Sequence, residues 1–245
     1  MMKAETPLKQ LNQRETSDPL TRNELEKLAH STIVRVFSTE TDSEMGGSGS
    51  LIWRRGNRHY LLTSLHVVSD SGQYQIQTPD DQVHRGQVVA TFSSTNEADL
   101  ALLRFQSSQS YPVLQFTVSL QGLIDQQTLA CGFPMTSQLV QSEELYCNTG
   151  KVSAILKQPL SGGYQVGYTN LIKQGMSGGP VLNQYGELVG VNGLSQFPLF
   201  SNAYTFQNGR LASEEEISII KALSWAIPTR TAIELLRKFR TQNSL

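Results

Sequence analysis

Short apolar stretches separated by turn-forming residues dominate the chain from about residue 30 onward. In the first half these stretches are Ile33 to Phe37, Ser50 to Trp53, Tyr60 to Ser64, Tyr74 to Thr78, Gln87 to Thr91 and Leu100 to Phe105. Each is short and rich in β-branched and aromatic residues, a composition that favours strands. The pattern therefore predicts six strands in this half.

A second series of similar stretches follows after residue 120. Its members are Thr128 to Gly132, Gly150 to Leu156, Tyr164 to Tyr168, Pro180 to Leu182, Glu187 to Asn192 and Ser224 to Ile227, with turns at Ser161 to Gly163 and Gln184 to Gly186. Two halves of six strands each predict an all-β fold of two six-stranded antiparallel β-barrels, over about residues 30–110 and 120–230.

Helical patterns occur only near the ends of the predicted domain. A serine or threonine stands three positions before a glutamate at three places: Thr21 with Glu24, Ser213 with Glu216, and Thr231 with Glu234. This spacing is the capping-box signal for a helix start. We expect short peripheral helices and a C-terminal helix. Residues 1–20 are polar and aperiodic, which predicts a flexible leader before one domain over residues 21–245.

The composition excludes several classes of partner. The 245 residues carry a net charge of −1, and their Lys and Arg residues are scattered along the chain. No basic stripe is available for a phosphate backbone, so we expect no nucleic-acid partner. The chain has neither a secretory h-region nor an apolar stretch near the roughly 18 residues of a membrane span. We therefore expect a cytoplasmic protein with no membrane partner.

The chain contains two cysteines, Cys131 and Cys147. They could form one disulfide, but the lack of a secretory signal favours two partly buried thiols. Neither has metal-ligand spacing to the histidines. We expect no metal site and no cofactor.

Three separated segments carry the residue types that acyl transfer needs. Ser177 lies among glycines in Gly175 to Gly179, where backbone N–H groups can approach a substrate carbonyl closely. His66 ends an apolar strand, a rigid mount for a general base. Asp99 immediately precedes a buried apolar run and is suited to hold one imidazole tautomer.

Each of these segments has a plainer interpretation when it is taken alone. Ser-Gly-Gly-Pro is a common turn sequence, and a single histidine or aspartate beside a strand is usually structural. The combination in this order is much more specific. His30, His59 and His84 lack the flanking pattern of His66, so we interpret them as surface or packing residues.

The order His66, Asp99, Ser177 and their flanks resemble the chymotrypsin superfamily of trypsin-like serine proteases, and within it the HtrA/Deg branch. Segments similar to that branch's landmarks occur in the same order: Gly47 to Leu51, Thr63 to Val68, Ala98 to Leu103, Gly132 to Pro134, Gly150 to Ile155, Gly175 to Val181, Gly190 to Asn192 and Trp225 to Pro228. The resemblance covers roughly residues 30 to 240. We expect an HtrA/Deg-like protease domain without a PDZ domain.

The resemblance implies a serine endopeptidase that hydrolyses protein or peptide substrates through an acyl-enzyme intermediate. It implies a catalytic triad of His66, Asp99 and Ser177, with the N–H groups of Gly175 and Ser177 forming the oxyanion hole. It also implies regulation by a protein partner or by loop ordering.

Substrate contacts are expected at Leu171, Asn192 and Gly193. By position Leu171 falls near the base of the primary specificity pocket, which favours an apolar substrate side chain. The acidic run Glu214 to Glu216 could instead supply negative charge to a basic substrate residue, although such a run at a helix start usually complements the helix dipole in solvent.

The segment from Leu194 to Leu223 is an insertion relative to that family. It contains Phe197, Phe200, Tyr204 and Phe206, so it could shape the substrate pocket or bind a regulatory partner, or simply cover the second barrel.

The alternative function is a protease-fold binding or scaffold module with little or no turnover. An esterase is a minor alternative, since a Gly-x-Ser-x-Gly elbow on a strand-to-helix turn is missing.

Overall fold

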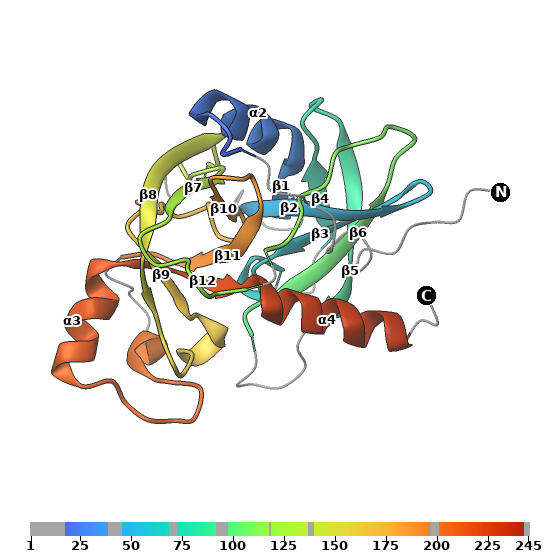
Figure 1. Ribbon diagram of the computed structural model, residues 1–245. Helices are drawn as coiled ribbons and strands as arrows, with labels where there is room; N and C mark the ends of the chain where they lie inside the picture. The colour runs from blue at the N-terminus through green and yellow to red at the C-terminus, as the bar shows by residue number, and fades with distance from the viewer. Residues whose placement is uncertain are drawn as a thin grey trace.

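The predicted pair of β-barrels is confirmed by the structure, a computed structural model. It describes residues 18–38, 46–68, 73–91, 98–117, 119–136, 140–196 and 201–242. Two closed barrels of six strands lie side by side (Figure 1). All neighbouring strands in both barrels pair antiparallel, as predicted from the short stretches and the turns between them.

The first barrel closes in the order β1-β2-β3-β6-β5-β4. Its strands are β1 (Ile33–Ser38), β2 (Gly46–Arg55), β3 (Arg58–Thr63), β4 (Tyr74–Gln77), β5 (Val83–Thr91) and β6 (Ala101–Gln106). Pairing between β1 and β4 closes the ring. The interior is filled by fully buried aliphatic side chains such as Val36, Leu61 and Leu103.

The second barrel closes in the order β10-β11-β12-β9-β8-β7. Its strands are β7 (Gln127–Gly132), β8 (Tyr146–Ile155), β9 (Val166–Tyr168), β10 (Pro180–Asn183), β11 (Leu188–Leu194) and β12 (Ser224–Pro228). Strand β9 begins at Val166, two residues later than the sequence predicts. The short 3-10 helix η2 (Ser161–Gly163) precedes it, and Tyr164 follows that helix outside the strand.

Two of the three predicted helix starts are confirmed. Helix α2 (Arg22–Thr32) is capped by Thr21 and helix α3 (Glu214–Ala222) by Ser213, each in a complete capping box. Helix α4 (Thr229–Gln242) begins two residues before the predicted cap at Thr231, directly after β12. The Thr229 hydroxyl donates to the Thr117 carbonyl at 2.9 Å, which anchors this helix start.

Helix α4 ties the two barrels together. It leaves the second barrel after β12 and runs along the first (Figure 1). There the Phe239 ring lies 5.9 Å from the Tyr60 ring of β3, centroid to centroid. A large apolar cluster between the barrels includes both rings together with Leu62, Leu100 and Trp225. The interface between the barrels is therefore a packed core.

The predicted leader is only partly within the described residues, because residues 1–17 lie outside them. Just beyond, the Leu20 N–H donates to the Gln184 carbonyl at 2.8 Å, and the Leu20 side chain packs against the central cluster. Among the helices of the described ranges, none has the length and apolarity needed to cross a membrane.

Cys131 and Cys147 form a disulfide, which corrects the prediction of two thiols. The residues are 16 apart in sequence but directly opposite each other in the antiparallel pairing of β7 with β8. Their Cα atoms are 4.2 Å apart. The sequence alone does not reveal this register, because it depends on how the two strands align.

Breaking this disulfide is expected to lower the free energy of unfolding. A bridge that closes a loop of about 15 residues typically stabilises by about 3 kcal/mol. We expect a loss of that size for Cys131→Ala/Cys147→Ala, measured by urea unfolding of the oxidised wild type and the variant. A reductant should destabilise the wild type and leave the variant unchanged. Equal unfolding midpoints for oxidised and reduced wild type would contradict the prediction.

The described part of the insertion covers one side of the second barrel. Phe206 is buried and forms a β-bridge with Leu160, next to η3 (Ser201–Tyr204). In α3, the buried Ile220 accepts a hydrogen bond at its carbonyl from the Trp225 indole of β12, at 3.0 Å. Phe197 and Phe200 lie outside the described residues. This packing favours the covering role over an open docking surface.

Glu216 connects Arg210 to the start of α3, and these contacts lower the pKa of its carboxyl. Its carboxylate accepts two hydrogen bonds from Arg210, both at 2.8 Å, and one from the Ser213 N–H. These contacts, led by the Arg210 hydrogen bonds, lower the pKa of Glu216 from 4.5 to about 2. Glu216 is therefore engaged in capping α3 and in binding Arg210, which leaves it no role in binding a basic substrate residue.

A pKa below the unfolded value means that this contact stabilises the insertion above about pH 4.5, and that the stabilisation is lost as the pH falls through about 2. We expect the Glu216 carboxyl to titrate near pH 2 in a 13C NMR experiment. Arg210→Gln should move the midpoint up toward 4.5. A midpoint that is the same in both proteins would contradict the assignment of the shift to Arg210.

Candidate active site

His66 and Asp99 meet at the edge of the first barrel that faces the second. His66 lies in the 3-10 helix η1 (Leu65–Val68), which follows β3, and Asp99 lies just before β6. His66 Nδ1 is 2.5 Å from Asp99 Oδ2, and the His66 backbone N–H donates to Asp99 Oδ1 at 2.8 Å. Asp99 thus holds both the ring and the main chain of His66. The imidazole remains about half exposed.

The same carboxylate is also held from the second barrel. The Tyr164 hydroxyl donates to Asp99 Oδ2, and the Asp99 N–H donates to the Gly162 carbonyl at 2.8 Å. Asp99 therefore accepts hydrogen bonds from the backbone of His66, its ring and Tyr164, which is typical of an ionised carboxylate.

Ser177 lies in the turn before β10, on the second barrel. The preceding residue, Met176, is fully buried in the core of that barrel and anchors the turn. Gly175 has a φ of +89°, and a Cβ there would lie 2.6 Å from the Phe133 carbonyl oxygen. Only glycine adopts this conformation readily in so little space.

Ser48, in β2 of the first barrel, fastens this turn in place. Its N–H donates to the Ser177 carbonyl at 2.7 Å, and its hydroxyl donates to the Gly175 carbonyl at 2.9 Å. The same hydroxyl accepts from the Phe133 N–H at 2.8 Å. These bonds turn the Gly175 and Ser177 carbonyls toward Ser48 and lock the backbone on both sides of Met176.

The N–H groups of Gly175 and Ser177 remain available. Neither donates to an acceptor within the described ranges of the chain. The carbonyl before them, that of Gln174, is held by the Met135 N–H at 2.7 Å. Two free donors on one tight turn can bind an anionic oxygen.

The three predicted substrate-binding residues have different surroundings. Leu171 is 51% exposed, and its backbone N–H and carbonyl both pair with the Asn148 side chain at 2.9 Å. Asn192 is fully buried, and its side chain accepts from the Tyr168 hydroxyl at 2.5 Å. This leaves the Asn192 side chain no access to a substrate.

Gly193, the third of these residues, lies against Tyr164. A Cβ at Gly193 would overlap the Tyr164 hydroxyl, so only a glycine at this position leaves room for the Tyr164 ring to reach Asp99. The structure therefore relates Gly193 to the support of Asp99 within the protein.

Sequence reasoning missed two residues of this arrangement, Ser48 and Tyr164. Ser48 stands within the Gly47 to Leu51 segment, but a serine between glycines gives no sign of the turn it holds. Tyr164 falls within a predicted strand, although the two glycines before it could indicate an unusual backbone. Both residues act on partners that are far away in sequence.

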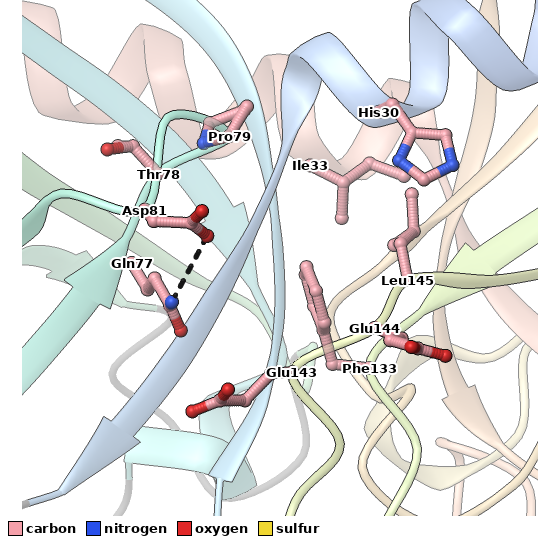
Figure 2. Close-up of a pocket in the computed structure, with 10 residues that line it drawn as sticks. All are labelled: His30, Ile33, Gln77, Thr78, Pro79, Asp81, Phe133, Glu143, Glu144 and Leu145. Atoms are coloured by element: carbon pink, nitrogen blue, oxygen red, sulfur yellow. Dashed lines mark hydrogen bonds between the residues drawn. The ribbon is translucent and has the colours of Figure 1, made fainter.

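A separate cavity of about 320 Å³ lies between α2, the β4–β5 turn and the segment leading into β8. Ile33, Phe133 and Leu145 form its apolar wall, and Asp81, Glu143 and Glu144 are also among its lining residues (Figure 2). His66, Asp99 and Ser177 do not line it. The cavity is therefore distinct from the candidate active site.

The other histidines are placed as packing or surface residues. His59 is fully buried and stacks on the Phe105 ring, with 5.0 Å between centroids, and burial is the main cause that lowers its pKa. His84 also stacks on the Phe105 ring, with 4.9 Å between centroids, and His30 is exposed beside the cavity. Within the described residues, no group of three or more His, Cys, Asp or Glu side chains is arranged to hold a metal ion.

Comparisons with known proteins support a protease relationship. DegS of Salmonella typhimurium, a serine endoprotease, is 28% identical over 149 residues, which cover 61% of this chain and 39% of that protein. DegS of Haemophilus influenzae is 29% identical over 198 residues, covering 78% and 49%. The Do-like serine protease HtrA of Lactobacillus helveticus is 25% identical over 203 residues, covering 81% and 43%. The chain thus spans less than half the length of these relatives.

The fold has a solved counterpart in a serine endoprotease from Yersinia pestis. That crystal structure matches with a TM-score of 0.65 and 23% identity, covering 91% of this chain and 68% of the other. The likeness supports the chymotrypsin-like double barrel. Residues 47–191, more than half of the chain, match the family profile described as the trypsin-like peptidase domain. This protein therefore belongs to the trypsin-like peptidase domain family.

Proposed function

We propose that the protein is a serine endopeptidase in which Ser177 is the nucleophile, His66 the general base and Asp99 the residue that orients it. The observation that carries the proposal is the double contact of Asp99 with His66, through the ring at 2.5 Å and the backbone N–H at 2.8 Å. With Nδ1–H donating to Asp99, Nε2 carries the lone pair of the neutral imidazole and is the ring nitrogen that can accept a proton.

In the proposed reaction, Ser177 Oγ attacks the carbonyl carbon of the scissile peptide while His66 Nε2 takes the hydroxyl proton. The carbonyl π pair becomes an oxyanion that accepts hydrogen bonds from the N–H groups of Gly175 and Ser177. The C–N bond then breaks, and the amine leaves with the proton from His66. A water molecule repeats the sequence on the acyl-enzyme and releases the acid.

We further propose that loop ordering or a protein partner controls this site, acting through residues 133–136 and 140–145. That segment holds the Gln174 carbonyl through Met135, and the Gln141 amide donates to the Phe133 carbonyl at 3.0 Å. The Gln141 side chain in turn accepts from Arg35 at 3.0 Å. A conformational change in this segment would therefore move the Gly175 N–H, which is proposed to bind the oxyanion.

The disulfide bears on the compartment in which the protein acts. Structural disulfides persist in oxidising compartments and are rare in the cytoplasm. The proposal of a cytoplasmic protein therefore requires that Cys131 and Cys147 occur as thiols in the cell. Alkylation of the cysteines in freshly lysed cells, followed by mass spectrometry, distinguishes the two states.

The proposed function is tested by labelling with a peptidyl phosphonate and by cleavage of a fluorogenic peptide library at neutral pH. We expect the phosphonate on the peptide that contains Ser177, and cleavage that reveals a preferred substrate residue. Labelling without cleavage would favour a latent enzyme. Neither labelling nor cleavage would contradict the proposal and favour a scaffold role.

A further inference from the structure

The carboxylate of Asp99 is held by residues of the other barrel. Asp99 precedes β6 of the first barrel, whereas Gly162 and Tyr164 lie between β8 and β9 of the second. The Gly162 carbonyl accepts the Asp99 N–H, and the Tyr164 hydroxyl donates to Asp99 Oδ2. The backbone and the side chain of Asp99 are therefore both fixed relative to the second barrel, which also carries Ser177.

Burial and the space beside Gly193 hold the Tyr164 side chain in this position. Its side chain is 6% exposed and belongs to the apolar cluster between the barrels. Gly193 leaves room for the hydroxyl, since a Cβ there would overlap it. Burial first, and then the charge of Asp99, raises the pKa of Tyr164 well above that of an ordinary tyrosine. The hydroxyl therefore keeps its proton and acts as a donor near neutral pH.

The insertion supports the segment that carries Tyr164. The Ser161 N–H donates to the Thr205 carbonyl at 2.7 Å, and the Gln207 N–H donates to the Pro159 carbonyl at 2.9 Å. Between them Phe206 lies in a β-bridge with Leu160. The guanidinium of Arg210 stacks on the Phe206 ring at 4.0 Å from its centroid. Residues 205–207 thus pair with residues 159–161 like an added strand.

We propose that Tyr164 is a positioning residue that holds Asp99 in line with His66, so that the two barrels present one aligned site. This inference rests on the proposed function, because it assigns Tyr164 a part in aligning the proposed triad. Tyr164 touches neither substrate nor reacting atoms and acts through Asp99 alone. Its hydroxyl restrains Oδ2, the same oxygen that orients the imidazole.

The test compares Tyr164→Phe with Tyr111→Phe in the full chain. Tyr111 is a matched control because it is also a buried tyrosine whose hydroxyl contacts a carboxylate, that of Asp80, at 3.0 Å. Phenylalanine preserves the ring packing in both variants. For each protein we would measure kcat and KM on a cleaved peptide, and the low-field 1H NMR signal of the His66 Nδ1–H.

We expect Tyr164→Phe to lower kcat by about tenfold with KM nearly unchanged, because a hydrogen bond to a charged group is lost while substrate contacts remain. The low-field signal should shift and broaden. Tyr111→Phe should leave kcat and the signal unchanged. An unchanged signal in Tyr164→Phe would overturn the proposal, and so would a changed signal with unaltered kcat.

The NMR signal separates this proposal from the proposed function. If wild type neither cleaves peptides nor reacts with the phosphonate, the proposed function fails. The effect of Tyr164→Phe on the His66 signal then still shows whether Tyr164 restrains Asp99. If wild type is active and the signal does not respond, the positioning role fails while the protease function stands.

Discussion

Ser177→Ala is expected to lower kcat for peptide cleavage by on the order of 10⁶-fold, with KM largely preserved. Removal of the nucleophile from a serine-histidine-aspartate site forfeits the covalent pathway and typically leaves only what binding and the oxyanion donors supply. The turn itself should remain folded. Met176 stays buried, and the bonds of Ser48 to the Gly175 and Ser177 carbonyls involve no atom of the Ser177 side chain.

The measurement is the turnover of a fluorogenic peptide by both proteins, with the unfolding temperature as a check on folding. Ser218→Ala is the matched control, since Ser218 is an exposed serine of α3 whose hydroxyl donates only to its own helix, at Glu214. It should keep full activity. Loss of activity of less than about tenfold in Ser177→Ala would show that another residue is the nucleophile.

The barrels were predictable from sequence because their signals are local. Short apolar stretches, β-branched and aromatic composition and turn formers lie within each strand and its neighbours. The capping boxes at Thr21 and Ser213 are equally local, and both are confirmed. The start of α4 was misplaced because Thr229 is anchored by Thr117, a contact that spans 112 residues.

The supports of the site were not predictable, because they depend on how the barrels meet. The hydrogen bond from Tyr164 to Asp99 spans 65 positions, and the bond from Ser48 to Gly175 spans 127. The two glycines before Tyr164 could indicate an unusual backbone, but nothing near it in sequence indicates Asp99 as its partner. Order and flanking residues indicated His66, Asp99 and Ser177, but the groups that hold them became visible only in three dimensions.

The insertion illustrates the same limit. Its aromatic residues suggested a pocket or a docking surface, because exposed apolar groups usually bind something. The structure instead places Phe206 against Leu160, where it is 3% exposed. The pairing partner that buries it is 46 residues earlier, so composition alone could not choose between the two roles.

Asp99→Asn is expected to lower kcat at neutral pH by about 10⁴-fold while leaving the fold intact. Asn can place its Oδ1 to accept the His66 backbone N–H, as Asp99 does at 2.8 Å. Its NH2 group then replaces Oδ2 and faces two groups that had been donors, the His66 ring and the Tyr164 hydroxyl. The imidazole then adopts its other neutral tautomer, in which Nδ1 accepts a hydrogen bond from the amide. Nε2 then carries the proton and no longer acts as a base.

The kinetics of Asp99→Asn should be compared with those of Asp80→Asn, which changes a carboxylate that accepts from Tyr111 and lies outside the proposed triad. Asp80→Asn should keep kcat within about twofold, because its contacts with Thr78 and Tyr111 involve none of the residues proposed to form the triad. A loss of less than about tenfold in Asp99→Asn would contradict the orienting role of Asp99.

The double variant Asp99→Asn/Tyr164→Phe gives the sharper comparison. A tyrosine hydroxyl both donates and accepts, so in Asp99→Asn the Tyr164 hydroxyl can turn and accept from the new amide. In that background, removal of the Tyr164 hydroxyl takes no donor from a charged oxygen. The proton of His66 is already on Nε2, so the ring cannot act as the base. We therefore expect Tyr164→Phe to cost about tenfold in the wild type and nearly nothing in Asp99→Asn. Equal costs in both backgrounds would mean that Tyr164 affects turnover by a route other than Asp99.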